Sequence, residues 1–415
     1  MIETQVRRDE QSREEKSMSY DPLNPAVTAD PYPHYALLRE ESPVKWVESM
    51  QGFVVSRWED VFQVLSDGKT FSSSQFWPAL LGEYDPVPEV APMISLDPPD
   101  HVRTRKLAAK AFVPSRVGAL EEKVRSVANS LVDEIIAKHG QSGEFDFVWE
   151  FSALFPVSVI ADVLGVDLQR RVDFKHWVDD VLSAGNRAAY GPERLAQIGR
   201  SSKAIRAYFE EVYDRRSAAP GNDLISGFIQ AEVGGERLSR NEVLNLAILL
   251  LIGGVETTTN LLGIIFVHFK RQPDVLAAVR ANPAKIPLLI EEVLRFDGPV
   301  QMLFRHTKCD TTLAGTAIPR GSLVMPLLGS ANHDERKFAN AKTLLLDRNP
   351  KEIMSFGQGP HFCLGQYLTR MEAKVAMAIL LDRFEALSPV SDEVAWMDSY
   401  FARGPKTLPV TFKVR

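Results

Sequence analysis

One cysteine, Cys363, lies in a glycine-rich loop directly before a long apolar segment, and this arrangement constrains the fold more than any other stretch. The loop reads Phe356-Gly-Gln-Gly-Pro-His-Phe-Cys-Leu-Gly, so glycines stand on both sides of the cysteine. Glycine lets a backbone come close to a flat or bulky group, and the amides at a helix N-terminus stabilise a thiolate. Cys363 is therefore a nucleophile, a single-thiolate metal ligand or a small buried hydrophobic residue.

The rest of the composition is that of an ordinary globular protein. The 415 residues are 45% hydrophobic and 25% charged, with a net charge of −6, which argues against nucleic-acid binding because such proteins are usually basic. Cys309 and Cys363 are the only cysteines, so there is no disulfide framework and we expect a cytoplasmic protein. Residues 1–20 are charged and lack an apolar run. We expect them to be a disordered tail without a signal peptide or membrane anchor.

Hydrophobic periodicity predicts one domain over residues 21–415, mainly α-helical with a smaller β-rich part drawn from both ends. Two β-type runs, 44–47 and 52–56, flank a short turn and predict a hairpin. Residues 72–96 are rich in proline and aromatic residues and predict a long irregular loop. Short β-type runs occupy residues 303–327, and a strand is expected near 408–412. The predicted helices are 34–41, 58–65, 101–112, 115–138, 148–164, 168–184, 192–215, 223–232, 239–270, 273–281, 284–296 and 364–384.

The predicted helix 239–270 contains Gly253-Gly-Val-Glu-Thr257. Its apolar run is shorter than the roughly 20 residues that a membrane span needs, so we expect a buried helix. A buried acid needs partners, a threonine can bond to the carbonyl one turn earlier, and two glycines permit a flat ligand to approach. The helix could also end at the glycine pair, but apolar residues 261–267 follow and favour a continuous helix.

Two sets of charged residues complete the pattern. Glu292 and Arg295 stand three residues apart on one helix face, where they can pair, and Arg348 precedes the cysteine loop. The second set is cationic, with His101 and Arg105 four residues apart on one helix face. Each of these residues taken singly is more often an ordinary surface or core group. The second set consists of His101, Arg105, Arg305 and His361.

In combination and in this order, the four motifs resemble those of the cytochromes P450, over residues 21–412. The resemblance implies the P450 fold, a helix-rich single domain of triangular outline with a smaller β-rich region. It also implies haem b with Cys363 as the iron ligand. Glu292, Arg295 and Arg348 would brace the segment that carries the cysteine. The residues implied to contact the haem or its propionates are His101, Arg105, Arg305, His361, Gly253, Gly254 and Phe356.

The resemblance further implies a soluble bacterial-type monooxygenase, which we expect to be a monomer. Thr257 and Glu256 are its implied catalytic residues, Thr257 at the oxygen side and Glu256 as a proton relay. The reaction inserts one oxygen atom of O2 into a C–H bond, as a hydroxylation or alternatively a demethylation or epoxidation. Electrons would come from NAD(P)H through a ferredoxin or flavodoxin and its reductase. Arg103, Lys106 and Lys110 would favour docking of such an acidic partner, or they simply face water.

By position, the implied substrate pocket is mostly apolar and aromatic, with Gln301 as its polar contact, and it suits a hydrophobic small molecule. Terpenoids, steroids, aromatics and polyketides all fit. Trp177 and Leu182 are candidates for a lid. Two rival interpretations stand beside this one: a haem protein that binds ligand without turnover, and an enzyme with a Cys363 nucleophile assisted by His361. The expected substrate-binding residues are Phe76, Trp77, Leu249, Ile252, Gln301, Met302, Leu303, Tyr400 and Phe401.

Overall fold

A computed structural model describes residues 20–109, 112–233 and 235–415. The expected disordered tail lies outside these residues except for Tyr20, which is buried and packs with its ring centroid 5.8 Å from that of Tyr35. Lys110, one of the three predicted docking cations, also lies outside them.

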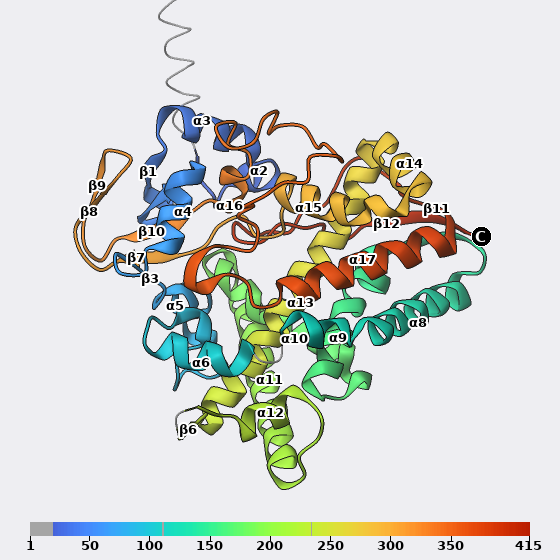
Figure 1. Ribbon diagram of the computed structural model, residues 1–415, viewed down its shortest axis with the longest axis horizontal. Helices are drawn as coiled ribbons and strands as arrows, with labels where there is room; N and C mark the ends of the chain where they lie inside the picture. Colours follow the sequence, from blue (N-terminus) through green and yellow to red (C-terminus); the bar gives the residue numbers. More distant parts are fainter. Residues whose placement is uncertain (1–19, 110–111, 234) are drawn as a thin grey trace, which may run out of the picture.

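Helices form most of the molecule, as the periodicity predicts (Figure 1). They are α2 (Pro25–Ala29), α3 (Tyr32–Glu41), α4 (Trp58–Ser66), α5 (Phe76–Leu81), α6 (Asp100–Ala109), α7 (Pro114–Gly118), α8 (Glu121–His139), α9 (Leu154–Leu164), α10 (Arg171–Ser183), α11 (Pro192–Ala218), α12 (Leu224–Gln230), α13 (Arg240–Arg271), α14 (Pro273–Ala281), α15 (Ile286–Phe296), α16 (Leu328–Ala331) and α17 (Gln366–Arg383). The shorter helical turns that matter below are η4 (Val148–Ser152), η6 (Ala184–Ala189) and η8 (Gly359–His361).

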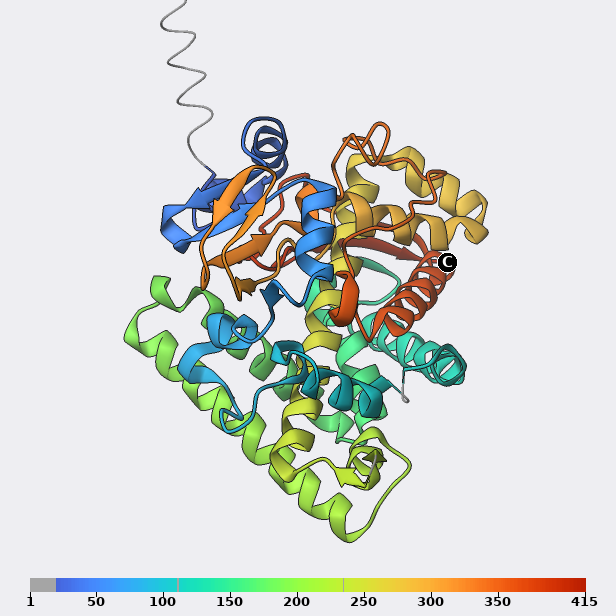
Figure 2. The same cartoon turned by 60° about the vertical axis from the view of Figure 1, so that its left-hand side comes forward.

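The strands form small sheets. The largest has the order β1-β2-β10-β7-β3, in which β1 and β2 are the predicted hairpin and β10 joins β2 in parallel. Strands from the N-terminal part of the chain and from residues 305–326 therefore form one sheet, which lies on one side of the molecule (Figure 2). A second sheet has the order β11-β12-β4. The strands are β1 (Val44–Val47), β2 (Gly52–Val55), β3 (Phe71–Ser72), β4 (Ser142–Asp146), β5 (Glu232–Val233), β6 (Glu236–Arg237), β7 (Arg305–Thr307), β8 (Thr311–Leu313), β9 (Thr316–Ile318), β10 (Leu323–Pro326), β11 (Phe384–Pro389) and β12 (Pro409–Val414).

The long helix α13 runs through the middle of the molecule (Figure 1). It begins at a capping box in which Ser239 and Glu242 bond to each other's backbone amides. It continues through Gly253 and Gly254, as the apolar residues after them predict. Its first half packs in one core with α10, α11 and α12, and its second half in another with α8, α15 and α17. Among the described helices α13 alone has the length and composition to cross a membrane, but 72% of that apolar window is buried inside the protein.

Three predicted elements differ from the structure. Residues 72–96 are not a continuous loop, because they include α5, whose Pro78 stands in the first turn where proline is tolerated. The helix predicted over 115–138 is divided into α7 and α8 near Gly118, since glycine is a poor helix former. Residues 148–152 form the π-helical turn η4 rather than the start of α9.

Candidate active site

The cysteine loop is a tight turn that ends at the first residues of α17. Gly357 and Gly359 both have φ of +69°, a conformation that favours glycine. A Cβ on Gly359 would also lie 2.6 Å from the carbonyl oxygen of Leu65, so this position has no room for a side chain. The amide of Cys363 donates to the carbonyl of Phe356 over 2.9 Å and closes the loop. The loop therefore fixes the sulfur at the start of α17, as predicted.

The surroundings of the Cys363 sulfur are electrostatically mixed. Enclosure by the loop raises the pKa of the thiol above its ordinary value. The amides of Gly365 and Gln366 and the guanidinium groups of Arg105 and Arg370 oppose that rise, because each stabilises a thiolate. Cys363 as a whole residue remains partly exposed. A thiolate so placed can bind a metal ion in front of the loop.

The predicted brace is present, with Glu292 and Arg295 fully buried and Arg348 partly exposed. Arg295 donates to both carboxylate oxygens of Glu292, over 2.9 and 2.7 Å, in a bidentate pair. Arg348 adds a third hydrogen bond to Glu292 over 2.9 Å. The remaining donors of the two arginines reach backbone carbonyls between residues 332 and 343. The network therefore holds α15 against the segment that leads to the cysteine loop.

Sequence reasoning missed the two residues that connect this brace to the loop. Asn332 accepts a hydrogen bond from the amide of Met354 over 2.7 Å and donates to the Ser355 hydroxyl over 2.9 Å. Ser355 in turn donates to the carbonyl of Leu294, on the helix that carries Arg295. Asn332 stands in an irregular segment with no periodic signal, so only its buried position reveals its role.

The four predicted cationic residues lie together on the side of the cysteine loop that faces α6 and β7. The rings of His101 and His361 are 4.0 Å apart, and Arg105 donates to the carbonyl of Phe362. Burial, followed by repulsion from His101 and the two arginines, lowers the pKa of His361 to about 3. Burial likewise lowers the pKa of Arg305 to about 10 and that of His101 below its ordinary value.

This cluster lacks the anion that would neutralise it. Asp97 is the acidic side chain that acts on it among the described residues, but Asp97 is bonded to Ser72, the Ser73 amide and Lys308. Nε2 of His101 is buried and has no hydrogen-bond partner in the described part of the chain. The lowered pKa values favour neutral imidazoles, so the two arginines carry the positive charge, and the buried guanidinium of Arg305 is unfavourable unless an anion joins it. The propionate carboxylates of a haem would supply this missing negative charge.

The middle of α13 offers the second half of such a site. Gly253 is exposed although most of its helix is buried, and a Cβ built on it would have no described atom within 4 Å. Thr257, one turn later, donates its hydroxyl to the Gly253 carbonyl over 3.0 Å, as predicted. Gly254, by contrast, lies against Ile160 of α9, so the structure does not support its predicted contact with the cofactor. Phe356 is buried on the cysteine side, beneath the guanidinium of Arg370.

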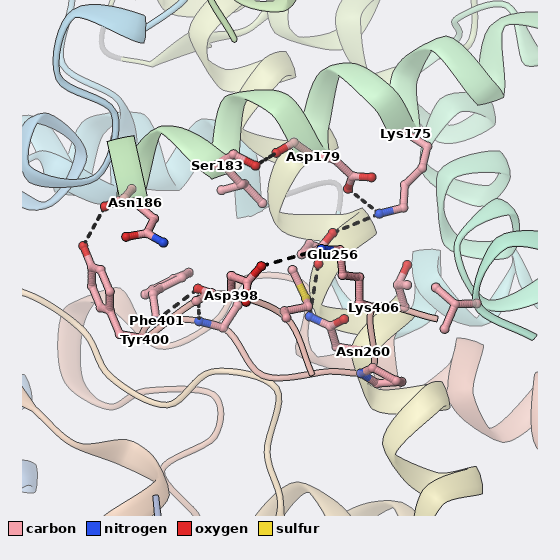
Figure 3. A pocket seen from close by; sticks show the side chains of 18 of the residues that line it. Lys175, Asp179, Ser183, Asn186, Glu256, Asn260, Asp398, Tyr400, Phe401 and Lys406 are labelled. Atoms are coloured by element: carbon pink, nitrogen blue, oxygen red, sulfur yellow. Dashed lines mark hydrogen bonds and ion pairs between the residues drawn. The ribbon is translucent and has the colours of Figure 1, made fainter. Parts of the chain in front are cut away.

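Glu256 points toward Lys175 of α10 (Figure 3). One carboxylate oxygen accepts from Lys175 over 3.2 Å and the other from the Asn260 amide over 3.2 Å. Lys175 also pairs with Asp179, so one ammonium group joins two carboxylates. Burial acts to lower the pKa of Lys175, but Glu256 and Asp179 outweigh it and raise the pKa. Burial and Glu256 raise the pKa of Asp179 to about 7, even though Lys175 opposes them.

A cavity of about 420 Å³ lies beside this cluster, between α10, α13 and the segment before β12 (Figure 3). Of the expected pocket residues, Tyr400, Phe401 and the proposed lid residue Leu182 line it. Phe76 stands behind them, its ring centroid 6.0 Å from that of Phe401. Its lining is Leu80, Val148, Trp149, Lys175, Asp179, Leu182, Ser183, Gly185, Asn186, Tyr190, Arg194, Glu256, Thr259, Asn260, Met397, Asp398, Ser399, Tyr400, Phe401, Ala402, Pro405 and Lys406.

Other expected pocket residues lie elsewhere. The Gln301 amide donates to the Gly298 carbonyl over 2.8 Å and accepts from the Tyr35 hydroxyl over 3.2 Å, so its predicted role as the polar contact is not supported. Trp177 packs on Phe174 and Tyr208 instead of covering the cavity. The polar lining that the sequence did not reveal comes mainly from α10. The remaining expected residues are buried or half-buried outside this lining: Trp77, Leu249, Ile252, Met302 and Leu303.

Comparison with known proteins agrees with this arrangement. The family model described as cytochrome P450 matches residues 43–412. Cytochrome P450 107B1 of Saccharopolyspora erythraea is 36% identical over 400 residues, which cover 93% of this chain and 96% of that protein. The vitamin D(3) 25-hydroxylase of Pseudonocardia autotrophica is 34% identical, covering 93% and 94%.

Solved structures show the same likeness in three dimensions. Cytochrome P450 CYP109Q5 from Chondromyces apiculatus superimposes with a TM-score of 0.86 at 39% identity, covering 95% of this chain and 98% of that one. Family membership makes haem b the cofactor that the cationic cluster and Cys363 fit. The chain belongs to the cytochrome P450 family and is a haem-dependent monooxygenase.

Proposed function

We propose that this monooxygenase inserts one oxygen atom of O2 into a C–H bond of a hydrophobic small molecule. The observation that carries the proposal is a division of roles along one turn of α13. Gly253 and Thr257 face the open side of the helix, whereas Glu256 borders a cavity with polar groups. In this proposal the Thr257 hydroxyl stands at the reacting side and Glu256 is a proton-carrying acid next to it.

Four cationic residues and one thiolate would hold the cofactor. Cys363 would bind the iron, and the propionates would take up the unpartnered donors of the cluster formed by His101, Arg105, Arg305 and His361. When bound, haem with a thiolate ligand supplies the activation of O2. The described residues supply binding, orientation and protons.

Thr257 and Glu256 have separate tasks in this proposal. Because the Thr257 proton is already given to the Gly253 carbonyl, the hydroxyl oxygen is free to accept a hydrogen bond and to hold a water molecule. Glu256 is held by Lys175 and Asn260, so it must exchange the Lys175 contact before it can carry a proton inward. The cavity beside Asp179 gives that exchange a route for water.

The apolar part of the cavity wall supports the proposed substrate class. Leu80, Leu182, Tyr190 and Phe401 present apolar and aromatic surface, which suits a hydrophobic molecule. Two solved structures of one relative, CYP109E1 from Bacillus megaterium, support this size and polarity: one is a complex with testosterone and the other a complex with corticosterone. Terpenoids, steroids, aromatics and polyketides are the classes to screen.

Electrons would reach this protein from NAD(P)H through a ferredoxin or flavodoxin and its reductase, in the cytoplasm, with the enzyme acting as a monomer. Arg105 and Lys106 lie on α6, close to the cysteine loop, and Lys106 is exposed. Arg103 contributes less than the sequence suggested, because it is paired with Glu242 of α13. The docking surface therefore depends on fewer free cations than predicted.

The test is reconstitution of the haem-loaded protein with a ferredoxin, its reductase and NADPH. A library of the four compound classes is screened in the presence of ¹⁸O-labelled O2. We expect a product that contains one labelled oxygen atom. Thr257→Ala should keep NADPH consumption, release more peroxide and form less product, and Thr257→Ser should restore the wild-type balance. A ligand-binding protein without turnover would consume no NADPH with any compound, and unchanged coupling in Thr257→Ala would contradict the role of the hydroxyl.

A further inference from the structure

One wall of the cavity is an irregular segment, residues 396–405, here called the C-terminal loop. It contributes seven lining residues, including Tyr400 and Phe401. Its backbone meets the rest of the fold at one isolated bridge, between Val300 and Ala402, where the Gln301 amide donates to the Phe401 carbonyl over 2.9 Å and the Arg403 amide donates to the Pro299 carbonyl over 2.8 Å. A second bridge, between Trp396 and Pro405, joins the two ends of the loop to each other. Because this backbone contact spans only a few residues, the rest of the loop depends on side chains for its position.

Arg403 adds side-chain contacts to this short backbone contact. Arg403 is 6% exposed and donates from Nε to Asp297 over 2.7 Å. Its Nη1 donates to the carbonyls of Thr28 and Ala29, each over 3.0 Å. The guanidinium also stacks on Trp396, 3.7 Å from the ring centroid, at the other end of the same loop. Arg403 thus connects the C-terminal loop to α2 and to the end of α15, and it connects the two ends of the loop to each other.

Asp297 is committed to this anchor. It is 2% exposed and accepts from the Tyr32 hydroxyl over 2.6 Å, with the His268 ring 3.1 Å away. Arg403, His268 and Tyr32 together hold the pKa of Asp297 well below its ordinary value despite burial. A buried ion pair contributes little net stability because both charges lose their hydration. Unlike an apolar contact, however, a hydrogen-bonded ion pair fixes the relative orientation of its two side chains.

The anchored part of the loop also fits closely against α13. A Cβ on Gly404 would lie 2.1 Å from Oδ1 of Asn260, and one on Gly263 would lie 2.5 Å from Pro405. Beyond the anchor, the loop crosses to η6, where the Tyr400 hydroxyl donates to the Gly185 carbonyl over 3.1 Å (Figure 3). A shift of Arg403 would therefore move Phe401, which stands two residues away and faces the cavity.

We propose that Arg403 is a positioning residue that determines ligand selectivity: by seating the C-terminal loop on Asp297, it sets where Tyr400 and Phe401 stand in the cavity. The inference rests on the proposed function, because it takes this cavity as the space that a bulky distal ligand enters. Arg403 does not touch the ligand. It acts through the wall, so it should affect large ligands and leave small ones unaffected.

The experiment compares two probes on the haem-loaded protein, imidazole and 4-phenylimidazole, by the shift of the ferric Soret band. Arg403→Lys keeps a charge beside Asp297 but loses the arm that reaches Thr28 and Ala29. We expect the ratio of the dissociation constants for 4-phenylimidazole and imidazole to change about tenfold, because small changes in a pocket produce discrimination of this size. The affinity for imidazole itself should stay within about twofold of the wild-type value. Tyr32→Phe, which removes one bond to Asp297, should change the ratio in the same direction by less.

Arg39→Lys is the matched control. Arg39 is 2% exposed and bonds to Ser330, but it does not line the cavity. It should lower the melting temperature without changing the ratio. The proposal is overturned if Arg403→Lys changes the ratio no more than Arg39→Lys does. If Arg403→Lys does not fold, an unchanged ratio in Tyr32→Phe overturns it. Absence of any imidazole shift in the wild-type protein would instead contradict the haem site itself.

Discussion

Replacing Glu372 by glutamine should stabilise the protein at neutral pH and remove part of the pH dependence of its folding. Glu372 lies on α17 and is 2% exposed. Its Oε2 accepts a hydrogen bond from the Thr258 hydroxyl of α13 over 3.2 Å, and among the described residues no cation acts on its pKa. Burial raises the pKa of this carboxyl from 4.5 to about 8, and the Thr258 bond opposes the rise only in part.

The sign and size follow from proton linkage. Because the folded-state pKa is the higher one, the unfolded chain loses this proton first, and stability falls as pH rises from about 4.5 to about 8. Each pH unit in that window costs about 1.4 kcal/mol for one group. At pH 7 the accumulated cost for Glu372 is about 3 kcal/mol, as an upper limit. Glutamine stays neutral at every pH and keeps an oxygen to accept from Thr258.

The assay is urea denaturation followed by tryptophan fluorescence at a series of pH values between the two pKa values, with Glu372→Gln compared with wild type. The difference in the free energy of unfolding should be small at the acidic end and grow with pH. Glu393→Gln is the control, because Glu393 is exposed. A difference that stays flat with pH, or a glutamine variant that is less stable at pH 7, would refute the reasoning.

Three further outcomes are expected. Cys363→Ser should abolish the red-shifted Soret band of the ferrous–CO complex; a band that persists would contradict the ligand assignment. Arg348→Met should lower the free energy of unfolding by about 2 kcal/mol, because it removes a charged hydrogen bond from buried Glu292; thermal denaturation measures it, and no loss would mean that Arg295 alone suffices. In the wild-type protein, the fraction of NADPH electrons recovered in product should show a step near pH 7, because the pKa of Asp179 is about 7 and its carboxylate competes with Glu256 for Lys175. Asp179→Asn should remove this step. A step that persists in the variant would show that another group titrates there.

The fold was predictable where local patterns decide it. The capping box and apolar run of α13, the β1–β2 hairpin and most long helices follow from periodicity and turn chemistry within a few residues. The pattern of residues 72–96 predicts a loop, because the proline and aromatic residues there mask a short helix that forms only when it packs on neighbouring elements. Short helices of this kind gain their stability from packing rather than from intrinsic propensity.

The site divides in a similar way. The cysteine loop, the pair formed by Glu292 and Arg295, and the Thr257 back-bond are contacts at fixed short spacings, so the sequence contains them. The substrate wall is not local: the loop that carries Phe401 is held by the Gln301 amide and by the pair of Arg403 with Asp297, contacts between residues about one hundred positions apart. No spacing rule indicates such a pair.

By itself the sequence determined the chemistry of this protein, because a thiolate loop, an acid beside a threonine and a paired Glu–Arg are each encoded within a single element. Only the tertiary structure decided that Gln301 turns toward Tyr35, that Gly254 faces α9, and that Lys175 bridges Glu256 and Asp179. The physical reason is that these contacts join different elements, and their directions depend on how helices and loops pack. The motifs that carry the chemistry are thus encoded in short stretches of sequence, whereas the shape of the pocket and the ionisation of its side chains depend on tertiary packing.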